Sequence, residues 1–345
     1  MENSSFVDTN ASSPSMDGSV VANVDAFVVG IVSVEVLIAS FGVIGNVLVI
    51  TVLQKLGKKK QSADYYLQNL AIADVGILLF AFPFFALRVR LPFNWPLGEF
   101  VCRYLYPLPE VSHGVSVWLV AVIAVERYYK LVTFKSLGVN RLRESRRAII
   151  VVACVWMMSF FVFCLPMYFV VDYHGLTNGG AWCGLKWPSW DHNMIIAIVY
   201  TAFLTLFSYI LPLMIISMTY LSVSRTIRRS SIFNKAITLE QHGFTQDAKK
   251  PSSTIKAQST RLRQNKRARK ILTPLVLVFA ITMLPLNFVR LTMVIRPSLV
   301  PRGYYKHVTF ALALFVLLNS SLNPVIYSIV SKSFRFRMKN LFPRR

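Results

Sequence analysis

Charged and amide side chains lie inside several long apolar stretches of this sequence, where a charge is costly and usually marks a functional site. Asp74 is one of them, and Ser116, Asn319 and Asn323 lie in other apolar stretches. Their carboxylate, hydroxyl and amide oxygens would together suit a hard monovalent cation. The sequence therefore predicts a buried cation site centred on Asp74, with a water-filled polar network that holds no ion as the alternative.

Two adjacent residues of opposite charge, Glu126 and Arg127, end another apolar stretch. The carboxylate could hold the guanidinium through a charge-assisted ion pair. Protonation of the acid, or movement of a neighbouring helix, would free the arginine. A purely structural ion pair is the alternative, which the neighbouring Tyr128 and the boundary position make less attractive.

Catalytic chemistry is not indicated anywhere in the chain. An intramembrane enzyme would need a nucleophile with its base or a metal constellation, but the apolar stretches offer only His113 and, near a boundary, His307. We interpret His113 as a pocket or core histidine. The four cysteines have no close Cys/His pairs of the zinc-binding kind. The sequence thus predicts no enzyme, no catalytic residue and no cofactor, apart from the cation expected at Asp74.

Seven apolar stretches must position these residues. Charged residues make up only 15% of the chain, against roughly a quarter in soluble domains. Each stretch approaches or exceeds the roughly 20 residues that cross a bilayer as a helix with its backbone satisfied internally. They cover residues 27–52, 64–87, 104–128, 148–171, 194–223, 271–295 and 308–330. The expected fold is an all-α membrane protein, a seven-transmembrane helix bundle over residues 27–330.

The distribution of basic residues sets the orientation of the bundle. The chain carries a net charge of +23, and the long connection 224–270 alone holds thirteen Lys and Arg residues. The first 26 residues hold none, so the positive-inside rule places the N-terminus outside and the C-terminus in the cytoplasm. Basic run 261–270 has no aromatic residues between its charges and abuts a span, which disfavours nucleic-acid binding. We expect a multi-pass plasma-membrane protein with the first span as signal anchor.

Two predicted features follow from the outer location of the N-terminus. Segment 1–26 contains glycosylation sequons at Asn3 and Asn10, and it should form an extracellular glycosylated tail. Cys102, at the outer mouth of the third span, and Cys183, in the outer connection before the fifth, lie on the oxidising side and are the expected disulfide. At the other end, Phe334, Met338 and Leu341 recur near helical spacing among basic residues, so segment 331–345 should include a short amphipathic helix on the inner leaflet.

Short motifs occur once per span and in a fixed order. The chain resembles the rhodopsin-like (class A) G-protein-coupled receptors, and the resemblance extends from Phe27 to about Phe342. Cys102 and Glu126 also have that family's usual separation of 24 positions. The residues that carry the resemblance are Gly45-Asn46, Leu70 to Asp74, Glu126-Arg127-Tyr128, Trp156, Pro212 with Tyr220, Phe279 with Pro285, and Asn323-Pro324-Val325-Ile326-Tyr327.

The resemblance implies a receptor that activates a heterotrimeric G protein and also meets arrestin. The cation at Asp74 would be sodium, bound in the inactive state. Arg127 would face the G protein, with Tyr220 and Tyr327 swinging inward to hold the open form. Two departures from the family pattern are Met283, where a tryptophan is usual, and Asn265, where many relatives have an acid.

The sixth span should be the helix that moves. Pro285 is its expected pivot, because a small rotation at a proline kink displaces the cytoplasmic end of a helix. Phe279, Met283, Asn287 and Arg290 follow spacings of four, four and three, so they share one helix face. That face should look into the bundle.

The outer half of the bundle indicates the chemical class of the ligand. A retinal ligand is disfavoured because Leu317 stands where a lysine is needed, and an amine ligand because Pro109 stands where an aspartate is needed. The long outer connection bearing Cys183 is typical of peptide and neuropeptide receptors. We expect a peptide, with a small acidic or lipid ligand as the alternative, and a secondary transporter is disfavoured because no internal repeat is visible. The candidate ligand-binding residues are Arg88, Glu110, His113, Asn287 and Arg290.

Overall fold

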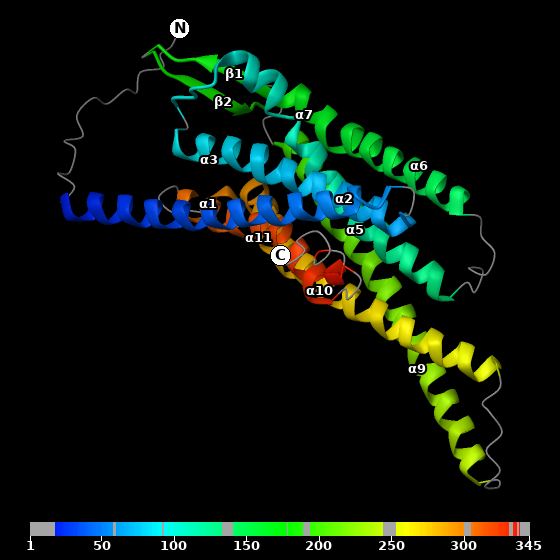
Figure 1. The fold of residues 1–345 in the computed structure, drawn as a ribbon. Helices are drawn as coiled ribbons and strands as arrows, with labels where there is room; N and C mark the ends of the chain where they lie inside the picture. The colour runs from blue at the N-terminus through cyan, green and yellow to red at the C-terminus, as the bar shows by residue number, and fades with distance from the viewer. Residues whose placement is uncertain are drawn as a thin grey trace, which may run out of the picture.

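The computed structural model shows a bundle of long helices with a small β-hairpin at one end (Figure 1). It describes residues 18–57, 60–91, 93–132, 141–177, 179–188, 194–243, 253–299, 305–330, 334–336 and 338. Within these ranges, seven helical segments are long and apolar enough to cross a membrane. The predicted fold class is confirmed.

Each span consists of one helix or of helices joined end to end. The first, sixth and seventh spans are α1 (Gly18–Gln54), α10 (Ser253–Ile295) and α11 (Tyr305–Val330). The second comprises α2 (Ser62–Gly76), η2 (Ile77–Ala81) and α3 (Phe82–Arg90), and the third comprises α4 (Gly98–Phe100), η3 (Val101–Leu105) and α5 (Pro109–Val132). The fourth comprises α6 (Arg141–Ser159), η4 (Phe160–Cys164) and α7 (Leu165–Val170), and the fifth α8 (Ile195–Thr205), η5 (Leu206–Ile210) and α9 (Leu211–Gly243).

The segments η2 to η5 are wide π-helical turns, and a proline follows each of them after one intervening residue. Proline lacks an N–H and its ring crowds the carbonyl four residues earlier. Widening the turn by one residue satisfies a backbone carbonyl that would otherwise stay open in lipid. At the end of each wide turn, the backbone N–H of the residue before the proline donates to the carbonyl five residues earlier. These residues are Phe82 before Pro83, Tyr106 before Pro107, Leu165 before Pro166 and Leu211 before Pro212.

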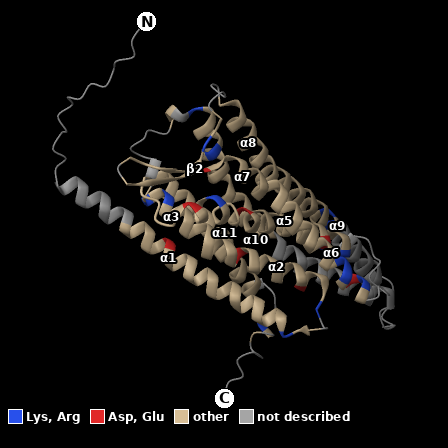
Figure 2. Ribbon diagram, turned by 90° about the horizontal axis from the view of Figure 1, so that it is seen from above, with Lys and Arg blue, Asp and Glu red and all other residues tan. Residues whose placement is uncertain are grey.

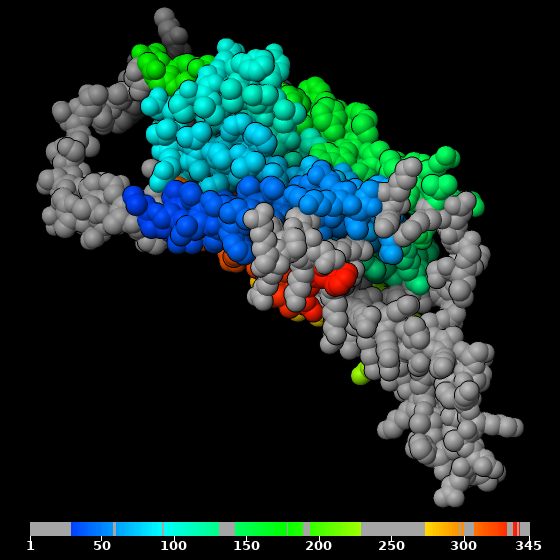
Figure 3. Space-filling view, viewed as in Figure 1, coloured from blue at the N-terminus to red at the C-terminus, as the bar shows by residue number. Residues whose placement is uncertain are grey.

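The third and seventh spans form the centre of the bundle. In their most apolar windows 56% and 61% of the residues are buried, against 28% to 33% in the other five. On α1, which lies at the edge, Leu37 and Phe41 face outward whereas Glu35 and Asn46 are fully buried. Such a helix, apolar outside and polar inside, suits contact with lipid. The space-filling view shows α1 and α2 as one continuous face (Figure 3).

The outer end carries a two-stranded antiparallel sheet. Strand β1 (Val171–Gly175) follows the fourth span directly, and β2 (Ala181–Leu185) pairs with it so that Tyr173 lies opposite Cys183. Trp95 donates from its backbone N–H to Ala181 at 2.8 Å, which joins the hairpin to the connection after the second span. The short 3-10 turn η6 (Pro297–Leu299) follows the sixth span. The hairpin lies at the opposite end of the molecule from the tips of α9 and α10 (Figure 1).

The expected loop at 224–270 and the expected tail at 1–26 are both partly helical in the structure. We expected a loop at 224–270, but α9 continues to Gly243 and α10 begins at Ser253. In the first part of α10, residues 253–270, Lys, Arg and Gln favour helix although they are polar, so this helix extends beyond its apolar part. Likewise α1 begins at Gly18, inside the expected tail 1–26. The sequons at Asn3 and Asn10 lie outside the described residues.

The C-terminal amphipathic helix is present where the chain is described. Phe334–Phe336 and Met338 are helical. Phe334 is buried and Met338 packs on the same core cluster, whereas Phe336 is exposed. Arg335 donates to the last carbonyls of α11, those of Ser328 and Ile329, and so caps that helix. Figure 2 shows mostly uncharged ribbon through the spans and blue basic residues gathered near the ends of α6 and α9.

Candidate functional site

A buried carboxylate joins three spans near the middle of the bundle. Asp74 on α2 is fully buried, and its two oxygens accept hydrogen bonds from Ser116 Oγ of α5 and Asn323 Nδ2 of α11, each at 2.8 Å. No described cation pairs with it. A fully buried carboxylate held only by neutral donors retains an uncompensated charge. These residues therefore fit a site for one monovalent cation.

The fourth predicted cation ligand, Asn319, forms a hydrogen bond to the sixth span. The side-chain oxygen of Asn319 accepts from Thr282 Oγ1 of α10 at 3.2 Å. Asn319 thus connects the sixth and seventh spans. On the other side Asn46 donates to the carbonyls of Gly42 and Ser320, at 2.9 and 3.2 Å. The result is a polar layer that links five spans through buried hydrogen bonds.

The predicted pair between Glu126 and Arg127 is wrong for this structure. Glu126 Oε1 instead binds Lys130 Nζ at 2.8 Å and accepts a short hydrogen bond from Ser62 Oγ. Adjacent residues on a helix point in different directions, whereas residues four apart share a face. Lys130 therefore reaches the carboxylate more directly than Arg127 does. The Arg127 Nε atom is buried and has no hydrogen-bond partner among the described residues.

The predicted face of the sixth span does look into the bundle. Phe279, Met283 and Asn287 are 1%, 1% and 3% exposed. Asn287 Oδ1 accepts from Ser208 Oγ of η5 at 3.3 Å, and its amide donates to the Met283 carbonyl. Tyr209 donates to the Ala280 carbonyl, about one turn before Pro285. The fifth span thus holds α10 on both sides of Pro285.

Two unlike charges share the outer part of the bundle. Glu110 and Arg290 lie near enough to His113 and to Tyr200 for both charges to act on each ring. They form no ion pair with each other, and no described residue forms one with either of them. His113 packs edge-on against Phe163, 6.4 Å between ring centres. The structure thus places Glu110, His113 and Arg290, from α5 and α10, in the same outer part of the bundle.

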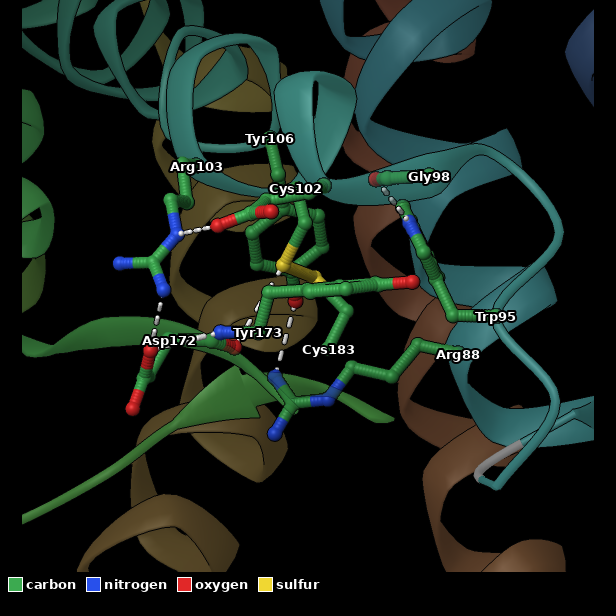
Figure 4. The surroundings of a disulfide bond; sticks show 10 residues. Arg88, Trp95, Gly98, Cys102, Arg103, Tyr106, Asp172, Tyr173 and Cys183 are labelled. Atoms are coloured by element: carbon green, nitrogen blue, oxygen red, sulfur yellow. Dashed lines mark hydrogen bonds and ion pairs between the residues drawn. A yellow bond between two sulfur atoms is a disulfide. The ribbon is translucent and has the colours of Figure 1, made fainter. Parts of the chain in front are cut away.

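Arg88, the remaining predicted ligand-binding residue, belongs to a different group. Its Nη1 donates to the Tyr106 hydroxyl at 2.8 Å, and Trp95 packs edge-on against the same ring. This group surrounds the disulfide between Cys102 and Cys183, which confirms the predicted pairing (Figure 4). The disulfide fastens β2 to the outer end of the third span. It thereby fixes the hairpin over the bundle.

A charge network beside the disulfide was not singled out from the sequence. Arg103 binds Glu99 at 2.7 Å and Asp172 at 3.1 Å (Figure 4). The other oxygen of Asp172 lies 2.9 Å from His174 Nε2 and 3.4 Å from Lys186 Nζ. Burial alone would raise the pKa of Asp172, but the Tyr173 N–H and the nearby cations lower it below its ordinary value. An open cavity of about 650 Å³ borders Arg103, Asp172 and Lys186.

Other residues that sequence reasoning missed are Ser62 and Lys130, which hold Glu126. The only available signal was the four-residue spacing of Glu126 and Lys130, since nothing in the sequence places Ser62 beside them. Tyr128 and Tyr220 are partly buried, whereas Tyr327 is 4% exposed and its hydroxyl has no hydrogen-bond partner among the described residues. The side chain of Asn265 lies outside the described residues. Glu35 on α1 is fully buried, and no described residue forms a hydrogen bond with either of its oxygens.

Seven apolar spans, a polar layer between them and a disulfide-fastened outer hairpin define a polytopic membrane receptor. Residues 45–327 match the model of the family "7 transmembrane receptor (rhodopsin family)", and the chain belongs to this family. It is therefore a class A G-protein-coupled receptor and not an enzyme, and it is a multi-pass protein of the plasma membrane.

Known receptors resemble the chain over most of its length. It is 31% identical to galanin receptor type 1 of Homo sapiens over 309 residues, 89% of this chain and 79% of that protein. Somatostatin receptor type 5 of Bos taurus is 29% identical over 306 residues, 87% of this chain and 74% of that receptor. Neuromedin-U receptor 2 of Mus musculus is 29% identical over 322 residues, 89% of this chain and 74% of that receptor.

The disulfide generates the first prediction. Replacing Cys102 with serine should lower the amount of receptor at the cell surface and its unfolding temperature, since a cross-link closing a long loop contributes about 2–4 kcal/mol. Cys154 is exposed and free, so Cys154→Ser is the matched control. Flow cytometry and thermal unfolding of the purified protein measure both. Equal surface levels and unfolding temperatures for the two variants would contradict the prediction.

Proposed function

We propose that the chain binds an extracellular ligand and activates a heterotrimeric G protein by outward movement of the sixth helix, α10. The observation that carries this proposal is the continuous inner face of α10. It runs from Arg290 in the outer part of the bundle, through Asn287 and Met283, to Phe279. A rotation at Pro285 would therefore couple a ligand at the outer end to the cytoplasmic end of the helix.

The ligand is a peptide in this proposal. Support comes from the relatives, which are receptors named for galanin, somatostatin and neuromedin U. The disulfide-fastened hairpin also leaves a broad polar rim, including Arg103, Asp172 and Lys186. A small acidic or lipid ligand is the second candidate, favoured only by the arginine at position 290.

Arg290 is the residue proposed to receive a carboxylate of the ligand. It has no described ion-pair partner, and Glu110 lies in the same region without pairing with it. Because both charges are partly shielded from water, each would gain from a complementary group on the ligand. A peptide that carries a carboxylate for Arg290 and a basic group for Glu110 fits this arrangement best.

The remaining parts of the proposal concern the two sides of the membrane. The N-terminus is extracellular, with glycans at Asn3 and Asn10, and the basic segments face the cytoplasm. There Arg127 meets the G protein, Tyr220 and Tyr327 support the open form, and arrestin is a further partner. Sodium at Asp74, with Ser116 and Asn323 as neighbours, would favour the inactive form by compensating the buried carboxylate.

The test of the function is nucleotide exchange. We expect the purified receptor in lipid nanodiscs to accelerate nucleotide exchange on at least one class of heterotrimeric G protein, and a peptide from a library of secreted peptides to increase that rate. Arg127→Ala should remove the acceleration, because the guanidinium is the proposed contact. The same preparation should show no solute uptake in vesicles. Absence of acceleration with every class of G protein, with and without the library, would refute the proposal.

The ligand contact generates a second test. Arg290→Gln should weaken binding of the active peptide about ten- to a hundredfold, because a bidentate contact to a carboxylate in a partly dry site contributes roughly 1.5–3 kcal/mol. A double-mutant cycle between Arg290→Gln and removal of each carboxyl group of the peptide identifies the partner. Arg296→Gln, an exposed arginine just beyond α10, is the control. Additive losses at every carboxyl group would exclude the contact.

The cation site can be tested without a ligand. Sodium chloride should raise the unfolding temperature of the receptor relative to choline chloride at equal ionic strength, since a bound ion stabilises the folded form. Asp74→Asn should abolish the difference, because the carboxylate supplies the only charge among the described ligands. A sodium-dependent rise that persists in Asp74→Asn would show that the ion binds elsewhere.

A further inference from the structure

The inner end of the third span holds one carboxylate and two cations. Glu126 Oε1 is bound by Lys130 Nζ at 2.8 Å and by the hydroxyl of Ser62, and Lys130 also donates to that hydroxyl at 2.9 Å. The three groups therefore form a closed triangle. Glu126 is 12% exposed and Lys130 31%, so the triangle is partly shielded from water.

The two atoms that could join Glu126 to Arg127 both lack a hydrogen-bond partner among the described residues. Within the part of the chain that the structure describes, Glu126 Oε2 is buried without a hydrogen-bond partner, and so is Arg127 Nε. A buried acceptor and a buried donor on adjacent residues would satisfy each other if the Glu126 side chain turned toward Arg127. The triangle prevents that turn. Arg127 consequently has no ion-pair partner among the described residues.

The neighbouring elements favour the triangle over the alternative pair. Lys130 lies one helical turn beyond Glu126 on the same face of α5. Ser62 is the first residue of α2, and the capping bond from the Gln61 N–H to Asp64 Oδ2, at 2.9 Å, fixes that helix start. The positive end of the α2 dipole there also favours a carboxylate. Glu144 of α6 lies 3.8 Å from Lys130 Nζ and keeps the ammonium in place.

We propose that Lys130, aided by Ser62, is a positioning residue that withholds Glu126 from Arg127 and thereby sets the basal activity of the receptor. The proposal rests on the proposed function, since Arg127 is the group that meets the G protein there. A receptor whose arginine is not held by its neighbouring acid starts closer to the active form. Lys130 competes with Arg127 for one carboxylate, so removing Lys130 should allow the acid–arginine pair to form.

The experiment measures basal nucleotide exchange by the purified receptor without ligand. Lys130→Gln should lower the basal rate about three- to tenfold, and Lys130→Arg, which can still bind Glu126, should restore it. In a Glu126→Gln background, Lys130→Gln should have no further effect, because the carboxylate for which the cations compete is gone. Arg146→Gln removes an exposed cation at the same end of the bundle and serves as the control for net charge.

Two results would overturn the inference. One is a basal rate in Lys130→Gln that equals or exceeds that of the wild type. The other is an equal loss in the Glu126→Gln background, which would mean that Lys130 contacts the G protein directly. If the wild type responds to a peptide but has no basal activity, the inference fails and the proposed function stands.

A second measurement does not depend on coupling. Lysines labelled with ¹³C at Cε keep their charge and all three N–H donors and give NMR signals, and Lys130→Arg identifies the signal of Lys130 by its loss. Glu126→Gln and Ser62→Ala should both shift that signal, because each removes one side of the triangle. An unchanged Lys130 signal in both variants would refute the triangle even if the receptor activated no G protein.

Discussion

The structure depends on one constraint, the absence of water in the bilayer core, which makes an unpaired polar group there costly and favours partners within the protein. The backbone meets it with helices, and at four prolines it does so with wide turns. Side chains meet it by reaching across spans, as Asp74 does to Ser116 and Asn323. The third and seventh spans are central because they carry the partners that the other spans need.

The two ends of the bundle are held in different ways. A covalent link and an ion-pair network around Asp172 fasten the outer hairpin, so the outer surface is a fixed frame. The inner end is held by hydrogen bonds and ion pairs that can exchange partners, with Glu126 as the clearest case. Between them, Thr282 binds Asn319 and Ser208 binds Asn287 on either side of Pro285 in α10. A rigid outer end and an exchangeable inner end, joined by one helix with an internal proline, suit the coupling of the two surfaces.

Much of the fold could be predicted from the sequence because hydrophobic length and charge placement act locally. The seven spans, the pairing of Cys102 with Cys183 and the inward face at Phe279, Met283 and Asn287 all follow from such local rules. The error concerns which of several partners a side chain selects, since Glu126 binds Lys130 rather than Arg127. The hydrogen bond between Thr282 and Asn319 was not predicted either. Those choices depend on side-chain direction and on residues such as Ser62 that approach from another span, and neither is visible in spacing alone.

The wide turns before the prolines have a consequence for how such a receptor can diversify. One extra residue in a helix rotates everything beyond it by about 100°. In the second, fourth and fifth spans the wide turn separates the inner half from the outer half, so the face that the outer half presents is set independently of the packing below it. A one-residue insertion or deletion there would present a different set of side chains to the extracellular space and leave the inner surface unchanged. The recognition surface and the signalling surface of one continuous span can thus evolve as separate modules.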